Sequence, residues 1–341
     1  MSEQYLIYGA ELSPYSVKIR AYFRYKEIPH KWIIRDQKSN TEYKKFAKLP
    51  IVPLVVTPEK KGLQDSTPII KLLEHEYQNN SVSPPETHTA FVARILEEYA
   101  DEWLNKAMFH YRWRYEDDQM SASERFVELI IPVWANKIPL LNRVLKRKFA
   151  ATVRKRMIAR LWVVGSNKST EIQIEQSLNI FLHLSEQHLQ DRPYFFGFRP
   201  SIADFGIWGQ VYNMWTDPTV GQVIESSHPE TLKWIKRMLH PKLEGEFEPW
   251  ESLEATLMPI LKQELADVFM PWLEANNKAL AKGEKELSVK IKGKDFTHSV
   301  GSPQKYHAKS FAMLLEEYND IPDKTKLDAV LQEAGLINYF K

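Results

Sequence analysis

The stretch GAELSPYSVKIRAYF (residues 9–23) places a serine-proline pair between an expected strand and an expected helix. Residues 5–8 form a short apolar run that predicts a strand, and the apolar spacing of residues 17–23 predicts a largely buried helix. Ser13 then lies at the helix start, where its oxygen can accept a hydrogen bond from a free backbone N–H, and Pro14 suits the first helical position. Because several N–H groups converge there, the hydroxyl could also help to hold an anion, so a plain cap and an anion site are both open.

The segments that follow alternate between strand and helix signals and end in a linker. In chain order they are the strand HKWIIRD (30–36), the helix TEYKKFAKL (41–49), the strands VPLVVTP (52–58) and LQD (63–65), the helix TPIIKLLEHEYQ (67–78) and the linker NNSVSPPE (79–86). The turn KKG between the last two strands predicts a hairpin. The first eighty residues are thus expected to have the order βαβαββα, and we place a domain boundary near residues 80–85.

Beyond the linker the apolar spacing becomes helical. Helices are expected near residues 91–107, 123–134, 142–162, 170–189 and 201–215, with Pro132 and Pro139 interrupting the second of them. Ser201 and Asp204 have the spacing of a capping box, which predicts a structural role for Asp204. From about Glu244 a further hundred residues follow, with a helix through Leu261 and Leu280, a hairpin in LSVKIKGKDFTHS (287–299), and helices around Phe311 and Leu331.

The composition is that of a folded protein with more than one domain. The chain has 341 residues, of which 43% are hydrophobic and 26% charged, and it has only twelve glycines, so we expect helices to dominate. There is no cysteine, which excludes disulfides, thiolate metal sites and a protein thiol nucleophile. The histidines lack zinc-like spacing, and the start of the chain lacks the features of a secretory signal. We therefore expect a cytoplasmic protein without a metal cofactor.

The net charge of +2 hides one strongly basic region. No Asp or Glu occurs between Leu129 and Thr170, whereas ten Lys and Arg residues lie between Lys137 and Lys168 with apolar residues interleaved at helical spacing. A solvated helix face, or one that pairs with acidic helices, explains this pattern. Binding to an anionic membrane surface or to nucleic acid through residues 137–168 is the alternative.

Taken together, these segments resemble the glutathione transferase superfamily, in particular its serine-type, bacterial-like members. The resemblance rests on Ser13 in SPYSVKIR, Val52-Pro53 in KLPIVPLVV, Asp65-Ser66 in LQDSTPIIKLLE and the cap Ser201 to Asp204, in that order over about 240 residues. It implies an α/β plus all-α fold with three parts. These are a thioredoxin-like glutathione-binding domain (1–80), an all-helical domain (88–243) and an extension of helices and a hairpin packed on the helical domain (244–341).

The resemblance also implies roles for five residues. Ser13 would contact the glutathione thiol, Val52 would pair its backbone with the cysteinyl part beside a cis Pro53, and Asp65 and Ser66 would hold the γ-glutamyl ammonium and carboxylate. Tyr15 and Ser16 are fallback hydroxyls. For each there is a structural alternative: a helix cap at Ser13, an ordinary trans proline at 53 and a plain cap pair at 65–66.

A second-substrate pocket would be bordered by Tyr15 and by Met108, Tyr111, Arg112 and Tyr115 on one helix, although aromatics at that spacing are also typical of a core or a dimer contact. The resemblance implies a cytoplasmic homodimer that uses glutathione as co-substrate and no metal. Its activity would be attack of the activated thiol on a hydrophobic electrophile. The alternative function is that of a non-catalytic interaction protein that kept the fold. A branch of the superfamily that needs a protein thiol is improbable because the chain has no cysteine.

Overall fold

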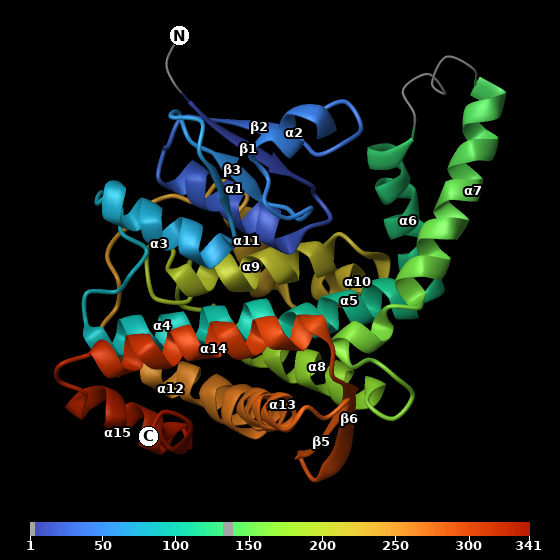
Figure 1. Cartoon of the computed structure of the whole chain (residues 1–341). Helices are drawn as coiled ribbons and strands as arrows, with labels where there is room; N and C mark the ends of the chain where they lie inside the picture. The colour runs from blue at the N-terminus through green and yellow to red at the C-terminus, as the bar shows by residue number, and fades with distance from the viewer. Residues whose placement is uncertain (1–3, 132–138) are drawn as a thin grey trace.

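The computed structural model describes residues 4–131 and 139–341. The N-terminal domain, in blue at the top of Figure 1, has the expected order βαβαββα. Its elements are β1 (Tyr5–Gly9), α1 (Pro14–Tyr25), β2 (His30–Ile34), α2 (Asn40–Phe46), β3 (Leu54–Val56), β4 (Gly62–Gln64) and α3 (Ser66–Glu76). The predicted thioredoxin-like domain is therefore confirmed.

The four strands form one mixed sheet in the order β2-β1-β3-β4. β1 and β2 are parallel, whereas β3 runs antiparallel to both β1 and β4. Because successive side chains of a strand point to opposite faces, Ile7 and Val55 join the core that includes α1 and α3, and Tyr8 and Leu54 pack with Tyr43 of α2 on the other face. The sheet is thus covered by helices on both sides.

The region after the linker is helical. Its elements are α4 (Thr87–Tyr99), η1 (Ala100–Leu104), α5 (Asn105–Arg114), α6 (Glu116–Ile130), α7 (Pro139–Ile158), η3 (Leu161–Val164), α8 (Glu171–His188), α9 (Ile202–Trp215), α10 (Pro218–Ser227) and α11 (Pro229–Arg237). α4, η1 and α5 follow one another without a break, and η1 is a π-helical turn within this run. Such wide turns change which side chains face a neighbouring element, and they occur often at functional sites.

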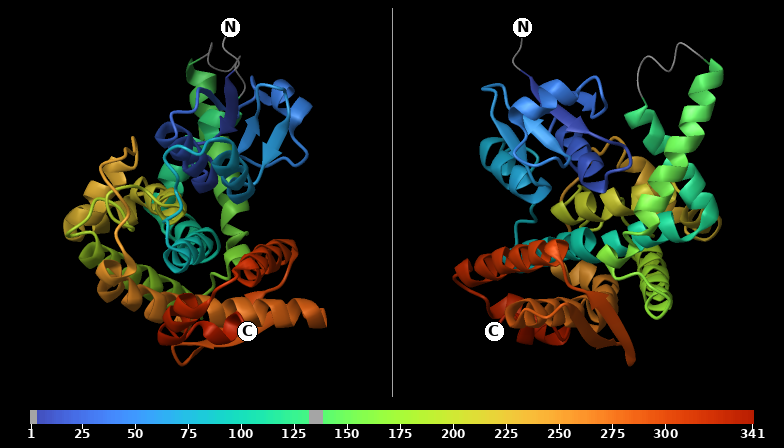
Figure 2. Two further views of the ribbon diagram at one scale, coloured as in Figure 1. Left: turned by 90° about the vertical axis from the view of Figure 1, so that its left-hand side faces the viewer. Right: turned by 45° about the vertical axis from the view of Figure 1, so that its right-hand side comes forward.

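The C-terminal extension lies along the side of the helical region that faces away from the sheet (Figures 1 and 2). It consists of α12 (Trp250–Ile260), η4 (Leu261–Phe269), α13 (Met270–Lys282), β5 (Glu286–Ile291), β6 (Lys294–Ser299), α14 (Ser302–Asp320), α15 (Thr325–Glu333) and η5 (Ile337–Tyr339). β5 and β6 form the predicted hairpin, and α14 packs against α4 and α13. The extension therefore contributes side chains directly to the centre of the molecule.

One hydrophobic cluster runs through all three regions. Trp103 of η1 lies 5.9 Å from Trp272 of α13 and 5.7 Å from Phe296 of β6, measured between ring centroids. α9 packs against both α1 and α4. Gly209 permits this contact, since a Cβ at that position would lie only 2.7 Å from the Pro14 carbonyl oxygen. The start of α1 is thereby held against the helical region.

The predicted capping box opens α9. The Ser201 hydroxyl accepts a hydrogen bond from the Asp204 N–H, and the Asp204 carboxylate accepts one from the Ser201 N–H at 2.9 Å. The other Asp204 oxygen accepts hydrogen bonds from the Phe195 N–H and the Trp234 ring N–H. Asp204 is fully buried, so the structural role predicted for it is confirmed.

Helix boundaries differ from the prediction around the basic region. α6 begins at Glu116 rather than near Ser123, because Tyr115 is extended and three acidic residues follow it in the first turn, where they favour the helix N-terminus. α7 begins at Pro139, a residue suited to a helix start, whereas Pro132 lies outside the described residues.

Among the described residues no helix is long and apolar enough to cross a membrane. The three-part division at residues 80, 88 and 244 stays a prediction.

Candidate functional site

The register of three strands brings three loops to one edge of the sheet. Leu54, the first residue of β3, lies opposite the penultimate residue of β1 and the last residue of β4. The chain therefore leaves β1 toward Ser13 and leaves β4 toward Asp65 at this edge. It enters β3 from Val52 at the same edge. Because neighbouring strands lie about 4.8 Å apart, these segments start within roughly 10 Å of one another.

Ser13 caps α1 at this edge, as predicted. Its backbone is extended, and its Oγ accepts a hydrogen bond from the Ser16 N–H at 3.3 Å, which is long for such a bond. Ser13 is half-buried. Within the described residues its hydroxyl donates no hydrogen bond. The hydroxyl proton is therefore available to an acceptor that arrives from outside.

The two fallback hydroxyls are less suited to that task. The Tyr15 hydroxyl donates a hydrogen bond to the Asp101 carbonyl oxygen at 2.8 Å, and burial raises the pKa of Tyr15 well above its usual value. Ser16 is fully buried and packs against Gly9. A Cβ added to Gly9 would lie 3.0 Å from the Cβ of Ser16. Of the three hydroxyls in this turn, that of Ser13 belongs to a half-buried residue and donates no hydrogen bond within the described residues.

Val52 lies at the same edge of the sheet, two residues before the start of β3. The Val52–Pro53 peptide bond is cis, as the resemblance implies. Within residues 4–131 and 139–341, neither the N–H nor the C=O of Val52 has a backbone hydrogen-bond partner. A short extended peptide could therefore pair with Val52 in the manner of an added strand.

Asp65 and Ser66 stand at the start of α3. Ser66 is the first helical residue and is 4% exposed, and Asp65 has φ 83° and ψ 120°, a conformation that residues with a Cβ rarely adopt. The Asp65 side chain makes no capping hydrogen bond. Instead its Oδ2 accepts a hydrogen bond of 2.6 Å from the Tyr306 hydroxyl of α14. The extension thus reaches the carboxylate that is expected to hold an ammonium group.

Comparison with known families agrees with this geometry. Residues 7–81 match the family described as "Glutathione S-transferase, N-terminal domain". Over these residues the chain is similar to that family. The match spans the whole edge that carries Ser13, Val52, Asp65 and Ser66. No curated protein is similar enough to the chain to count as a match.

Solved glutathione transferases are among the structures similar to this chain. One from Methylobacterium radiotolerans, in complex with glutathione sulfonate, is 16% identical over 69% of this chain and 90% of its own, with a TM-score of 0.41. The Tau class enzyme of mango, Mangifera indica, is 16% identical over 70% and 89%, with a TM-score of 0.44. The β-etherase LigF from Sphingobium is 16% identical over 74% and 98%, with a TM-score of 0.43.

A cavity of about 240 Å³ lies next to the first turn of α1. It is lined by Tyr15, Glu102, Asn105, Lys106, Val163, Val164, Pro303, Tyr306 and His307. These residues come from α1, η1, α5, η3 and α14. The extension therefore forms one wall of the cavity, and the N-terminal domain contributes Tyr15.

The other four residues expected to border a second-substrate pocket do not line this cavity, and their role stays a prediction. Met108 is buried in the main core, and Tyr111 stacks on Tyr115 with ring centroids 5.5 Å apart. Arg112 is buried and bonds to the Asp217 carboxylate at 2.7 Å and to the Leu12 carbonyl oxygen at 3.0 Å. The side chains of this helical run that line the cavity belong to Glu102, Asn105 and Lys106, which precede Met108.

Lys106, Glu102 and His307 of the cavity were not anticipated. Lys106 is 1% exposed, and burial lowers its pKa to about 7. The Glu102 carboxylate is in contact with Nδ1 of His307, whose pKa burial lowers to about 4. A lysine and a glutamate four positions apart are typical of a solvated helix face, so the sequence had offered no signal that both side chains are buried.

A buried ion-pair network joins α1 to α4 beside the cavity. Lys18 contacts the carboxylates of Glu97 and Asp101, the latter at 2.5 Å, and Arg94 contacts Glu97 and Glu98. Burial raises the pKa of Asp101 to about 7, while burial of Glu97 is outweighed by Arg94 and Lys18, which lower its pKa to about 2. Because Tyr15 bonds to the Asp101 carbonyl, the network also fixes the first turn of α1.

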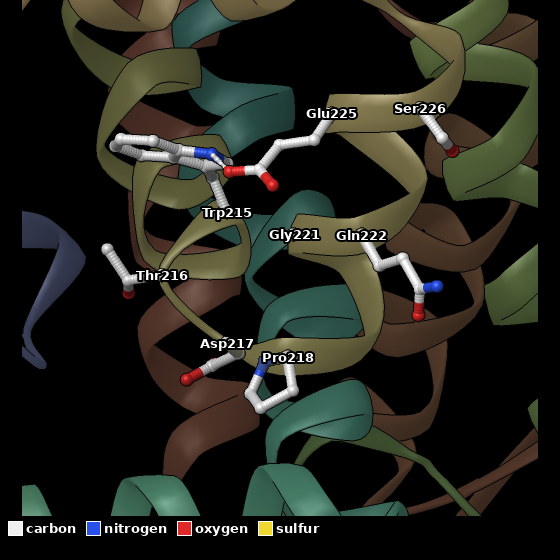
Figure 3. A pocket seen from close by; sticks show the side chains of 8 residues that line it. All are labelled: Trp215, Thr216, Asp217, Pro218, Gly221, Gln222, Glu225 and Ser226. Carbon is white, nitrogen blue, oxygen red and sulfur yellow. Dashed lines mark hydrogen bonds between the residues drawn. The ribbon is translucent and has the colours of Figure 1, made fainter.

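Two other hollows lie away from this edge. The first, of about 530 Å³, lies between the end of α9 and α10 and is open to solvent. Figure 3 shows Trp215 and Glu225 turned toward each other there, joined by a hydrogen bond of 3.1 Å. Its Asp217 is held by Arg112 and Arg125. Trp215, Glu225 and Asp217 of this hollow therefore already have hydrogen-bond or ion-pair partners.

The second hollow lies between α6 and α7 and is lined by part of the basic region, including Arg143, Lys146, Arg147 and Arg154. Lys146 contacts Glu128 of α6, and Arg154 donates to the Ser123 hydroxyl. Lys137 lies outside the described residues. In the described part of the chain no group of three His, Asp or Glu residues could hold a metal ion.

Proposed function

We propose that this protein is a glutathione-dependent transferase that activates the glutathione thiol for attack on a hydrophobic electrophile. The observation that carries the proposal is the sheet edge at which Ser13, Val52 and the Asp65-Ser66 pair are brought together by strand register. The backbone of Val52 pairs with the cysteinyl residue of glutathione, because its N–H and C=O have no partner within the described chain. The cysteinyl sulfur then lies toward Ser13 at the start of α1.

The γ-glutamyl end of glutathione is held at the start of α3. Its carboxylate accepts hydrogen bonds from the Ser66 hydroxyl and from a free N–H of the first helical turn, which the helix dipole also favours. Its ammonium pairs with the Asp65 carboxylate. The unusual backbone conformation of Asp65 supports a binding role, since such conformations concentrate at ligand sites.

The magnitudes are sufficient for thiol activation by Ser13. Lowering a thiol pKa from about 8.5 by about two units requires roughly 2.7 kcal/mol. One hydrogen bond to a charged acceptor contributes about 1.5–3 kcal/mol, and a helix N-terminus adds about 0.3–1 kcal/mol. The free hydroxyl proton of Ser13 at the start of α1 therefore accounts for the activation without a second protein group.

We extend the proposal to the assembly and location implied by the resemblance, a homodimer in the cytoplasm. Light scattering tests the assembly, and the expected mass is twice the chain mass of 40.0 kDa. A mass of one chain would contradict the dimer without affecting the proposed chemistry.

Calorimetric titration with glutathione tests the binding step. We expect heat of binding at millimolar ligand or below, and the absence of heat at millimolar glutathione would contradict the proposal. Binding without turnover across a panel of electrophiles would instead favour the non-catalytic interaction protein.

Substitution of Ser13 tests the catalytic step. In Ser13→Ala the loss of about 1.5–3 kcal/mol of hydrogen bonding should raise the pKa of bound glutathione by about one to two units. The thiolate absorbance of the complex, titrated against pH, measures this shift. A plain helix cap would cost about 1 kcal/mol of stability and leave the titration curve in place. Coincident curves for the two proteins would return Ser13 to the role of a cap, and Ser16→Ala serves as the matched control because that hydroxyl is buried.

A further inference from the structure

The cavity beside α1 contains a lysine whose charge has no counter-ion in the described residues. Lys106 is 1% exposed, and no carboxylate of residues 4–131 or 139–341 pairs with its ammonium group. Its recorded contacts are with aromatic rings, the Trp272 ring centroid at 3.7 Å from Nζ and that of Trp103 at 6.0 Å. Such cation–π contacts stabilise a desolvated charge, but they offset the cost of its burial only in part.

Lys18 provides a comparison within the same molecule. It is equally buried, but it contacts two carboxylates, and their attraction outweighs burial and raises its pKa. For Lys106 burial acts alone and lowers the pKa to about 7. Lys18 thus pairs with neighbouring carboxylates, whereas in the described part of the chain Lys106 pairs with none and contacts aromatic rings instead.

The other titratable groups near Lys106 do not supply that anion. Glu102 lines the same cavity, but its carboxylate is in contact with Nδ1 of His307. His307 and His298 both have their pKa values lowered, chiefly by burial, to about 4 and about 3, so both are neutral near pH 7. The Tyr15 and Tyr306 hydroxyls donate to Asp101 and Asp65.

The remaining walls of the cavity suit an apolar body. Val163, Val164 and Pro303 line it together with the ring of Tyr15. Tyr15 belongs to the first turn of the helix that Ser13 caps, so a molecule in this cavity lies next to that turn. A volume of about 240 Å³ admits a small molecule of the size of one substituted aromatic ring.

We propose that this cavity binds the electrophilic substrate and that the electrophile carries a carboxylate, which pairs with the Lys106 ammonium while its apolar part packs on Val163, Val164 and Pro303. That this ligand is a substrate rests on the proposed transferase function. The binding of a small carboxylate to the cavity does not depend on glutathione. The ligand supplies the anion that the described residues do not.

The test compares cinnamate with cinnamamide, two probes of similar shape of which one is charged. Both are titrated into the protein near pH 6, with and without glutathione, and binding is followed by calorimetry and by tryptophan fluorescence, since Trp272 and Trp103 adjoin Lys106. We expect cinnamate to bind at least about tenfold more tightly than cinnamamide, because a charge-assisted pair is stronger than a neutral hydrogen bond. This preference should decline above pH 7 as Lys106 loses its proton.

Three variants test whether the preference for cinnamate over cinnamamide depends on Lys106. Lys106→Met, which keeps the length of the side chain, should lose about tenfold in cinnamate affinity and leave cinnamamide binding unchanged. Lys278→Met is the matched control, because Lys278 is exposed and pairs with Glu274 on α13. Glu102→Gln should strengthen cinnamate binding several-fold by removing a like charge from the cavity, and it keeps the test decisive if the Lys106 variant does not fold.

Equal affinity of the wild-type protein for the two probes, or a preference that survives Lys106→Met, would overturn the inference. An unaltered preference in Glu102→Gln would do the same where the Lys106 variant fails to fold. Failure of the proposed function is distinguishable, since absence of glutathione binding leaves the cinnamate titration without glutathione unaffected.

Discussion

The edge of the sheet and the cavity beneath it are built in different ways, although both adjoin the first turn of α1. At the edge, Ser13, Val52 and Ser66 present backbone groups or short side chains at the ends of strands and helices. The cavity is formed by long side chains from segments as distant as Tyr15 and His307, and its charges are buried. The first region can be recognised from short motifs, whereas the second exists only where α5, η3 and α14 meet.

The two regions are physically joined at two points. Lys18 connects α1 to the carboxylates of Glu97 and Asp101, and Tyr306 connects the extension to Asp65 at the edge. Breaking each joint, and removing the cavity's own charge, tests how independent the two regions are.

The largest effect is expected from Lys18→Met. The substitution leaves the buried carboxylates of Glu97 and Asp101 without their shared cation, which should lower the free energy of unfolding by about 3–5 kcal/mol. Urea unfolding measures the change. Lys45→Met is the control, because Lys45 and Glu42 form an exposed pair for which about 0–1 kcal/mol is expected. Equal effects of the two variants would mean that the buried network does not hold α1 to α4.

Lys106→Met should change how stability depends on pH. The pKa of Lys106 is about 7 in the folded protein and 10.5 at its ordinary value, so between these values the unfolded chain binds more protons. The wild-type protein should therefore gain stability from this residue as pH rises from about 7 to 10.5, on the order of a few kcal/mol, and carry the full penalty below pH 7.

The difference in unfolding free energy between Lys106→Met and the wild type isolates this contribution. The free energy of unfolding of the variant should exceed that of the wild type most near pH 6, and this difference should shrink toward pH 10. A difference that does not vary over this range would show that the buried ammonium is not destabilising.

The smallest effect is expected from Tyr306→Phe, which removes the hydrogen bond between the extension and Asp65. The free energy of unfolding should fall by about 0.5–1.5 kcal/mol. Glutathione affinity should rise about two- to tenfold, because the ligand's ammonium no longer competes with the phenol for Asp65. Calorimetry of glutathione binding measures it, with Tyr318→Phe, which loses a hydrogen bond to Asp328, as control. Weaker glutathione binding in Tyr306→Phe would indicate that the phenol itself contacts the ligand.

Much of the fold was predictable because its signals are local. The order βαβαββα, the cap at Ser13, the capping box of Ser201 and Asp204 and the β5–β6 hairpin each depend on residues a few positions apart. The residues of the second-substrate pocket stay a prediction. Met108, Tyr111, Arg112 and Tyr115 were chosen for their place on a helix where the resemblance puts the border of the cleft, whereas the cavity beside Tyr15 is lined by Glu102, Asn105 and Lys106 of the same helical run.

The sequence by itself determined which residues cap helices, which runs form strands and where the sheet edge carries its hydroxyl and carboxylate, since these properties follow from backbone hydrogen bonding and from neighbours along the chain. Only the tertiary structure decided that Lys106 is buried without an anion in the described chain, and that Tyr306 reaches Asp65 across 241 positions. Burial and charge pairing depend on what packs against a side chain, and for these residues the packing comes from an extension that is remote in sequence.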